Sequence, residues 1–212
     1  MRPPSPFPDR PRLRRSRRHE WRPLTEGERR WLGEVLALCG LGPRRAGRPS
    51  AHGAVARLEA CLEAAARGLP WREARSAAAP GLAPEALRRC FLRWARRGVF
   101  AEMLRAMRFA GAPSAAMEWF ACLAYRRAWR AQGREGVALA RRCGFASALR
   151  APPSWMPDPD MSAWWWQEVI RPLALPLERM CAGMCRLVGA MARLGRVHHG
   201  VRRIPAWAKA GW

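Results

Sequence analysis

Residues 84–97 carry five guanidinium groups at a spacing that suits an α-helix. At about 100° per residue of an α-helix, they share the face opposite three large hydrophobic side chains. The basic set is Arg88, Arg89, Arg93, Arg96 and Arg97, and the hydrophobic set is Leu87, Phe91 and Trp94. Guanidinium groups donate paired hydrogen bonds to phosphate oxygens and to guanine edges. The pattern favours either a helix that enters a DNA groove or an amphipathic helix with a solvated basic face. Leu92 lies among the arginines, and we expect it to contact either a thymine methyl or another helix.

The charge of the whole chain also indicates a polyanionic partner. Its formal net charge is +23, from 39 basic and 16 acidic residues, and every basic residue except Lys209 is an arginine. Nucleic acid is the usual partner of such a surplus, and a solvated basic surface or an anionic membrane are the alternatives. GC-rich coding bias also enriches a sequence in Arg, Ala, Gly and Pro, so it can account for part of the charge.

The acidic residues do not form a catalytic pattern. Metal-dependent strand cleavage needs separated carboxylates that hold two divalent ions. The only aspartates are Asp9, near the N-terminus, and Asp158 and Asp160, which share one proline-rich loop. Tyr125 and Lys209 are the single residues of their types, so a tyrosine-based cleavage signature is also missing. We predict no catalytic residues.

The cysteines favour reduced thiols over a metal site or a disulfide framework. Cys181, Cys185 and His198 imitate the start of a zinc finger, but His199 follows directly, where a ligand three to five residues later is needed. The seven cysteines are odd in number and scattered singly. We therefore predict no metal and no cofactor.

The sequence also predicts a cytoplasmic, nucleoid-associated protein that does not enter a membrane. No apolar run reaches the roughly 18 residues of a membrane span. The N-terminal residues lack the apolar run of a secretory signal.

The predicted fold class is all-α, a helix-turn-helix-like bundle followed by additional helices. Residues 1–23 hold many arginines and prolines and are predicted to form a disordered basic arm, either along phosphates or as a solvated tail. Thr25 with Glu28 forms a capping-box signature, and Gly40 is a natural helix end.

A helix-turn-helix-like unit is predicted to position the arginines. It consists of a helix over 51–67, a Pro-Trp turn, a short helix over 71–78 and the basic helix over 84–97. Trp71, Phe91 and Trp94 are predicted to be structural aromatics wedged between helices. Arg48 and Arg72 are predicted to contact phosphates beside them.

Residues 108–150 are predicted to be a helical extension. Residues 151–212 read as a Pro/Trp-rich linker and a C-terminal amphipathic helix. A seven-residue hydrophobic repeat over 177–194 predicts packing onto the N-terminal bundle or pairing in a homodimer.

Several spaced motifs in residues 24–107 give a resemblance to a known family. They are Leu24-Thr25, Gly47-Arg48-Pro49, Gly68-Leu69-Pro70-Trp71-Arg72-Glu73, Phe91-Leu92-Arg93-Trp94 and Gly98-Val99-Phe100. In this order they resemble the N-terminal DNA-binding domain of bacterial insertion-sequence transposases of the DDE type. The resemblance implies binding to double-stranded DNA, including terminal inverted repeats. Trp31 stands two residues later than the family's tryptophan, and "LAPEAL" replaces its usual start of the basic helix.

The same resemblance implies a ribonuclease-H-like catalytic domain downstream, with two aspartates and a glutamate, and this chain shows none. We therefore expect a DNA-binding protein derived from a transposase by truncation or frameshift. One alternative is a transposase component whose catalytic part is supplied in trans or by a programmed frameshift. Another is a helical protein-interaction module whose charge is incidental.

Overall fold

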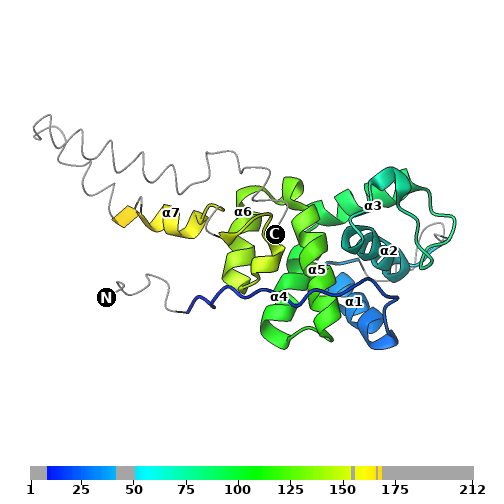
Figure 1. Ribbon diagram of the computed structural model, residues 1–212, viewed down its shortest axis with the longest axis horizontal. Coiled ribbons are helices and arrows are strands. Elements are labelled where there is room, and N and C mark those ends of the chain that lie inside the picture. Colours follow the sequence, from blue (N-terminus) through cyan, green and yellow to red (C-terminus); the bar gives the residue numbers. More distant parts are fainter. Residues whose placement is uncertain (1–8, 42–50, 154–155, 166, 169–212) are drawn as a thin grey trace, which may run out of the picture.

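The computed structural model describes residues 9–41, 51–153, 156–165 and 167–168, which form a bundle of packed helices (Figure 1). The helices are α1 (Glu26–Leu38), α2 (Ala54–Ala66), α3 (Pro84–Arg96), α4 (Val99–Ala110), α5 (Ala115–Arg127), α6 (Trp129–Cys143) and α7 (Pro159–Trp165). Two 3₁₀ turns are η1 (Trp71–Glu73) and η2 (Ala146–Ala148). The described residues contain no β-strand, and the predicted all-α class is confirmed. None of the described helices is both long and apolar enough to traverse a bilayer.

Local sequence signals set the start of α1 and both ends of α3. The predicted capping box is present, because the Thr25 hydroxyl accepts from the Glu28 N–H and the Glu28 carboxylate accepts from the Thr25 N–H. Pro84 lies in the first turn of α3, as predicted. Gly98 separates α3 from α4 at φ 77°, a left-handed conformation that favours glycine.

The short helix predicted over 71–78 is wrong, because only the three residues of η1 form a helical turn there. Ala74 is already extended, and the Ser76 hydroxyl accepts from the Ala78 N–H at 3.2 Å. A serine that bonds the nearby backbone in this way competes with helix formation. An irregular segment over 74–83 therefore joins η1 to α3.

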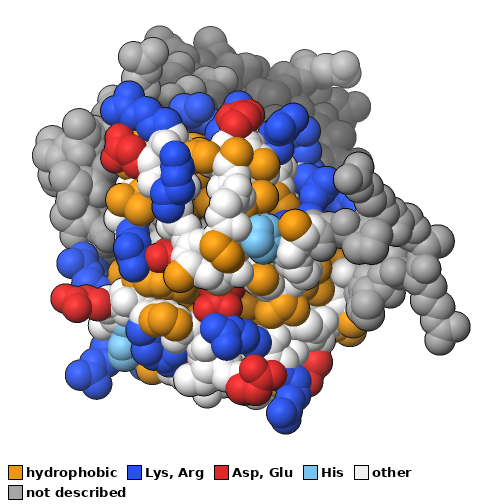
Figure 2. All heavy atoms as spheres, turned by 90° about the vertical axis from the view of Figure 1, so that its right-hand side faces the viewer, with side chains coloured by type: hydrophobic (Ala, Val, Ile, Leu, Met, Phe, Trp, Pro, Cys, Tyr) orange, Lys and Arg blue, Asp and Glu red, His pale blue; other side chains and the backbone are white. Residues whose placement is uncertain are grey.

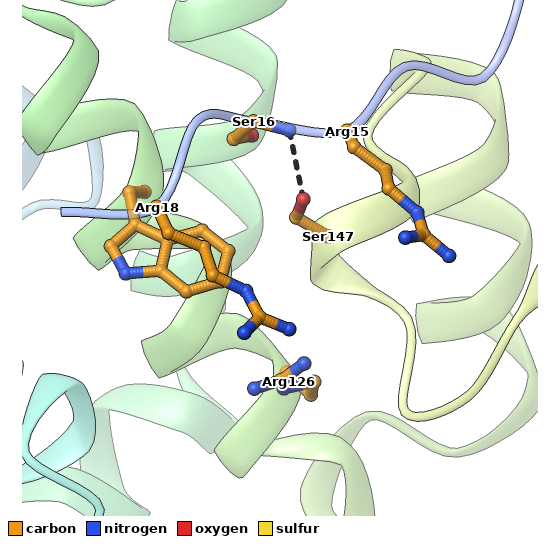
Figure 3. Close-up of a pocket in the computed structure, with 6 residues that line it drawn as sticks. Arg15, Ser16, Arg18, Arg126 and Ser147 are labelled. Carbon is orange, nitrogen blue, oxygen red and sulfur yellow. Dashed lines mark hydrogen bonds between the residues drawn. The ribbon is translucent and has the colours of Figure 1, made fainter. Parts of the chain in front are cut away.

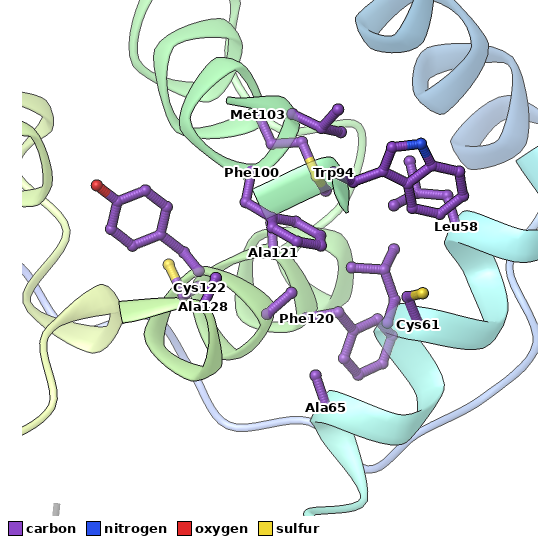
Figure 4. Close-up of a cluster of buried hydrophobic side chains, with 14 of the residues drawn as sticks. Leu58, Cys61, Ala65, Trp94, Phe100, Met103, Phe120, Ala121, Cys122 and Ala128 are labelled. Carbon is purple, nitrogen blue, oxygen red and sulfur yellow. The ribbon is translucent and has the colours of Figure 1, made fainter. Parts of the chain in front are cut away.

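The core is built around α5, whose side chains are buried on nearly all sides. Figure 4 shows side chains of α2 (Leu58 and Cys61), α3 (Trp94), α4 (Phe100) and α5 (Phe120) together in this cluster. One continuous cluster of buried residues runs from residue 24 to residue 149. The structure therefore differs from the predicted division at residue 107, since 24–107 and 108–150 share one hydrophobic core. The shared core is difficult to predict from the sequence, because the small side chains of alanine-rich stretches give weak amphipathic periodicity.

Residues 9–23 do not form the disordered arm predicted over 1–23, since they lie extended against the helices (Figure 1). The Arg14 N–H donates to the Gly144 carbonyl at 2.9 Å, and the Ala146 N–H donates to the Arg14 carbonyl at 2.9 Å. These bonds form an isolated β-bridge between the segment and the end of α6. Proline-rich, basic composition argues against a helix, but it does not prevent an extended segment from pairing with the bundle.

Side chains also tie this segment to the bundle. The Arg14 guanidinium donates two hydrogen bonds to the Glu118 carboxylate of α5, at 3.0 and 2.6 Å. Trp21 packs against Phe120 with ring centroids 4.8 Å apart. The segment is therefore part of the folded core. Residues 1–8 lie outside the described residues.

Glu28 joins this segment to α1 and α5. Its side chain is buried and accepts from the Arg22 guanidinium at 2.8 and 2.7 Å and from the Ser114 hydroxyl at 2.5 Å, besides the Thr25 N–H. Burial alone raises the pKa of Glu28, but the hydrogen bonds from Arg22, Ser114 and Thr25 outweigh it and lower the pKa to about 2.

We expect Glu28→Gln to lower the free energy of unfolding by about 3 kcal/mol at pH 7, because it breaks a buried ion pair and its hydrogen bonds. The folded-state pKa of Glu28 lies below its ordinary value of 4.5, so this stabilisation is complete above pH 4.5 and is lost as pH falls toward 2. The difference between the two proteins should therefore shrink across that range. Urea denaturation followed by circular dichroism at several pH values measures it.

Glu26→Gln is the matched control, because Glu26 is exposed in the first turn of the same helix. We expect it to change the unfolding free energy by less than about 0.5 kcal/mol. Equal losses in the two variants, or a pH-independent difference for Glu28→Gln, would contradict the described network.

Candidate nucleic-acid interface

The hydrophobic face of α3 is seated in the core. Leu87, Phe91 and Trp94 have exposed fractions of 2%, 1% and 3%. The Phe91 ring lies 4.7 Å from the Phe100 ring of α4, and Trp94 faces Leu58 of α2 (Figure 4). Since three neighbouring positions are held by surrounding helices, the opposite face of α3 has a fixed orientation.

Trp71 lies between two helices, at the position predicted for a wedge. Its ring is 4.9 Å from the Phe91 ring of α3, and the Arg127 guanidinium of α5 lies 3.8 Å from its ring centroid on a cation–π contact. Arg127 also donates hydrogen bonds to the carbonyls of Ala64 and Leu69 at the end of α2. Trp71 thus links the turn after α2 to α3 and α5.

The exposed basic face of α3 is narrower than the sequence suggested. Four of its arginines are exposed, namely Arg89, Arg93, Arg96 and Arg97. Arg88 lies on the flank of this face, is partly buried and pairs with Glu85 at 3.1 Å. Arg93 also donates to the Cys90 sulfur at 3.6 Å, which directs its stem along the helix surface. We call Arg89, Arg93, Arg96 and Arg97 the α3 basic face.

The other residues that were predicted to contact DNA are not part of the α3 basic face. Leu92 is partly buried and packs against the core, as expected if it contacts another helix. Arg72 is highly exposed and pairs with Glu73 at 3.1 Å. Arg48, the other residue predicted to contact phosphates beside the basic helix, lies outside the described residues.

The arginines of α3 occupy the middle and the C-terminal half of the helix. Basic side chains there interact favourably with the negative end of the helix dipole. The first turn instead holds Pro84 and Glu85, and a carboxylate at that end repels phosphate. The charge distribution therefore favours a helix that lies lengthwise against a polyanion over one that inserts its N-terminus.

Basic side chains are not confined to α3. Figure 2 views the side of the molecule on which α1, α2 and α3 are labelled in Figure 1, and basic, acidic and hydrophobic side chains alternate over it. On α2, Glu59 is buried and pairs with Arg29 at 2.8 Å, and Glu63 pairs with Arg67 at 2.9 Å. Arginines near α2 are thus paired with carboxylates, whereas the described residues place no carboxylate in an ion pair with the α3 basic face.

Two buried thiols lie beneath this face. Cys61 of α2 and Cys90 of α3 share a hydrogen bond, and this bond lowers the pKa of Cys90, an effect that burial opposes and the charges of Arg57 and Arg93 reinforce. Burial raises the pKa of Cys61. All five cysteines in the described part of the chain are free, in agreement with the predicted reduced thiols.

The two aspartates that the sequence placed in a loop lie at the start of α7, Asp158 just before it and Asp160 in its first turn, and both form ion pairs. Asp158 accepts from Arg10 at 3.0 and 2.8 Å, and Asp160 accepts from Arg142 at 2.9 and 2.6 Å. Arg141 reaches the carbonyls of residues 153, 156 and 157, which precede α7. These carboxylates fasten the start of α7 to α6 and to the N-terminal segment.

Sequence reasoning missed a second basic site. Arg15, Arg18 and Arg126 line one pocket (Figure 3), although Arg126 follows the other two by more than a hundred residues in the sequence. Only the paired N-terminal segment brings them together, and no spacing in the sequence signals it.

Within the described residues, no group of three His, Cys, Asp or Glu side chains is placed to hold a metal ion. The zinc-like residues Cys181, Cys185, His198 and His199 lie outside them, as does the 177–194 repeat. No family model matches this chain, and neither the curated proteins nor the solved structures include a match.

Proposed function

We propose that this protein binds double-stranded DNA through the α3 basic face, and that residues 24–107 are related to the transposase DNA-binding domain that they resemble. The supporting observation is the division of α3 into two faces. Phe91 and Trp94 are buried in the core, whereas Arg89, Arg93 and Arg96 are exposed on the other side. Terminal inverted repeats of an insertion element are the proposed target.

The spacing of the basic face suits a duplex. At a rise of 1.5 Å per residue, Arg89 and Arg97 are about 12 Å apart along the helix axis. Duplex DNA carries one negative charge per about 1.7 Å of its axis, so four guanidinium groups over this length meet several phosphates. A helix fits the width of the major groove, where an arginine also reads guanine through two hydrogen bonds.

Phosphate contacts are expected to dominate the affinity. The arginines lie away from the N-terminal turn that recognition helices usually place against base edges. Arg72, on the adjoining turn, adds a further exposed guanidinium to the contacts of α3. Phosphate contacts position a protein on DNA without reading its sequence, so we expect only a modest preference for terminal inverted repeats over other duplexes.

The salt dependence of binding tests the proposal. If about six phosphates are neutralised, the association constant should fall roughly as the fifth power of the salt concentration. Fluorescence anisotropy of a labelled duplex, titrated at several sodium chloride concentrations, gives this slope. A flat response would contradict the proposal, and self-association that persists at high salt without DNA affinity would instead identify an interaction module.

A further inference from the structure

Two cysteine side chains meet where α2 packs against α3. Cys61 of α2 is 0% exposed and belongs to the buried cluster of Figure 4, and Cys90 of α3 is 5% exposed. The two thiols share a hydrogen bond. The Cys61 sulfur also lies 3.9 Å from the carbonyl oxygen of Leu87, one turn before Cys90 on α3. Two separate contacts thus place the Cys61 sulfur against the turn of α3 that carries Cys90.

Positive side chains lie beside the Cys90 sulfur. The Arg93 guanidinium, on the next turn of α3, donates to this sulfur at 3.6 Å. Arg57 lies one turn before Cys61 on α2. The hydrogen bond with Cys61 lowers the pKa of Cys90, burial opposes this effect, and the charges of Arg57 and Arg93 reinforce it. Since the thiolate is the form of cysteine that reacts with oxidants, this setting activates Cys90.

Burial has the opposite effect on the three other cysteines that the structure describes. It raises the pKa of Cys39, Cys122 and Cys143, and that of Cys122 to about 12. A thiol with a raised pKa stays neutral and reacts slowly with peroxide. Cys122 moreover neighbours the Ser16 hydroxyl at 3.6 Å, a group that cannot form a disulfide. Among the described cysteines, Cys90 is therefore the one whose surroundings favour reaction.

We propose that Cys90 and Cys61 form a reversible disulfide when the protein meets hydrogen peroxide. The Cys90 thiolate attacks one peroxide oxygen, the O–O bond breaks, and the leaving hydroxide takes up a proton to become water. Cys90 is then a sulfenic acid. The Cys61 sulfur attacks the Cys90 sulfur, the S–O bond breaks, and hydroxide leaves as water with the Cys61 proton. The two thiols lose two electrons and two protons, and the peroxide is reduced to two waters.

The packing of α2 on α3 favours the disulfide over further oxidation. A sulfenic acid condenses with a thiol that it meets, and Cys61 is already in contact with Cys90. The sulfurs of a disulfide are about 2.05 Å apart, so small rotations about the two Cα–Cβ bonds bring them from hydrogen-bond contact to bonding distance. Arg93 is exposed, so its contact with the Cys90 sulfur places that sulfur directly beneath the surface. Peroxide therefore reaches Cys90 before Cys61.

Peroxide treatment of the reduced, full-length protein tests this pair. After a pulse of hydrogen peroxide and alkylation of the remaining thiols, peptide mapping by mass spectrometry should find Cys61 joined to Cys90. Dithiothreitol should then restore both thiols. Cys122 should remain reduced and serves as the internal control, and mapping separates the expected bond from one that involves Cys181 or Cys185. If Cys61 and Cys90 stay reduced, or are oxidised no faster than Cys122, the proposal is overturned.

Two cysteine variants separate the two steps. In Cys61→Ser the reaction should stop at the Cys90 sulfenic acid, which dimedone traps as an adduct on Cys90. In Cys90→Ser the Cys61 thiol should stay reduced, as Cys122 does. A dimedone adduct on Cys61 in this second variant would contradict the order of the steps. Circular dichroism checks that both variants fold, and the mapping of the wild type decides the proposal without them.

Arg93→Gln tests the charge beside the Cys90 sulfur. The variant should move the midpoint of the rate of Cys90 oxidation against pH upward by about half a unit or more, because the thiolate loses a charged hydrogen-bond donor. The two proteins should react equally fast at high pH, where both are thiolates. Arg30→Gln is the matched control, since it removes an exposed arginine from α1 and should leave the midpoint unchanged. Equal midpoints in Arg93→Gln and the wild type would overturn this role of Arg93. These readouts use no DNA, so they are independent of the function proposed for the α3 basic face.

Discussion

Replacing Arg89, Arg93 and Arg96 together with glutamine should weaken duplex binding roughly 100-fold or more at physiological salt. Each arginine is exposed on the same side of α3, and each lost contact to phosphate or base is worth about 1 kcal/mol or more. Glutamine keeps a similar stem and helix propensity, so the fold should be retained. Anisotropy titration measures the affinity, and circular dichroism checks the helix content.

The matched control removes the same charge elsewhere. Arg30, Arg105 and Arg108 are also exposed, on α1 and α4. Their joint replacement by glutamine lowers the net charge equally, and we expect less than a fivefold loss of affinity from it, through long-range attraction alone. Equal losses in the two triple variants would show that net charge, and not α3, carries the binding.

Replacing Trp94 with alanine should lower the free energy of unfolding by about 3–5 kcal/mol. Trp94 is 3% exposed between α3 and α2, so truncation removes a large buried surface and leaves a cavity. Since Trp94 helps to fix the orientation of α3, duplex affinity should fall as well, even under conditions where the protein remains folded. Urea denaturation followed by circular dichroism measures the first effect.

Trp129→Ala controls for the loss of an indole. Trp129 is 39% exposed at the start of α6, and the Arg150 guanidinium carbon lies 3.5 Å from its ring centroid. An exposed cation–π contact is worth about 0.5–1 kcal/mol, so this variant should lose little stability. If both tryptophan variants were equally stable, Trp94 would not seat α3 in the way described.

Much of the fold around α3 is predictable from local sequence signals. Thr25 with Glu28, Pro84 and Gly98 each act within one turn of their own position, through capping or a restricted backbone conformation. The burial of Phe91 and Trp94 follows from helical periodicity. These features need no knowledge of the rest of the chain.

The features that sequence did not predict depend on long-range contacts. The bridge at Arg14 and the ion pair with Glu118 connect residues more than a hundred positions apart. The composition of the N-terminal segment predicts disorder, because composition carries no information about the surface of the same chain against which the segment packs. The pocket around Arg18 and Arg126 depends on that same pairing, so it is also absent from any local pattern.

The most direct test of the account compares salt dependence in three proteins. The slope of log association constant against log salt concentration is measured for the wild type, the α3 triple variant and the matched triple variant. Phosphate contacts by α3 predict a slope of about −5 in the wild type and in the matched variant, and one shallower by nearly three in the α3 variant. Identical slopes in all three would contradict contact between the α3 basic face and DNA.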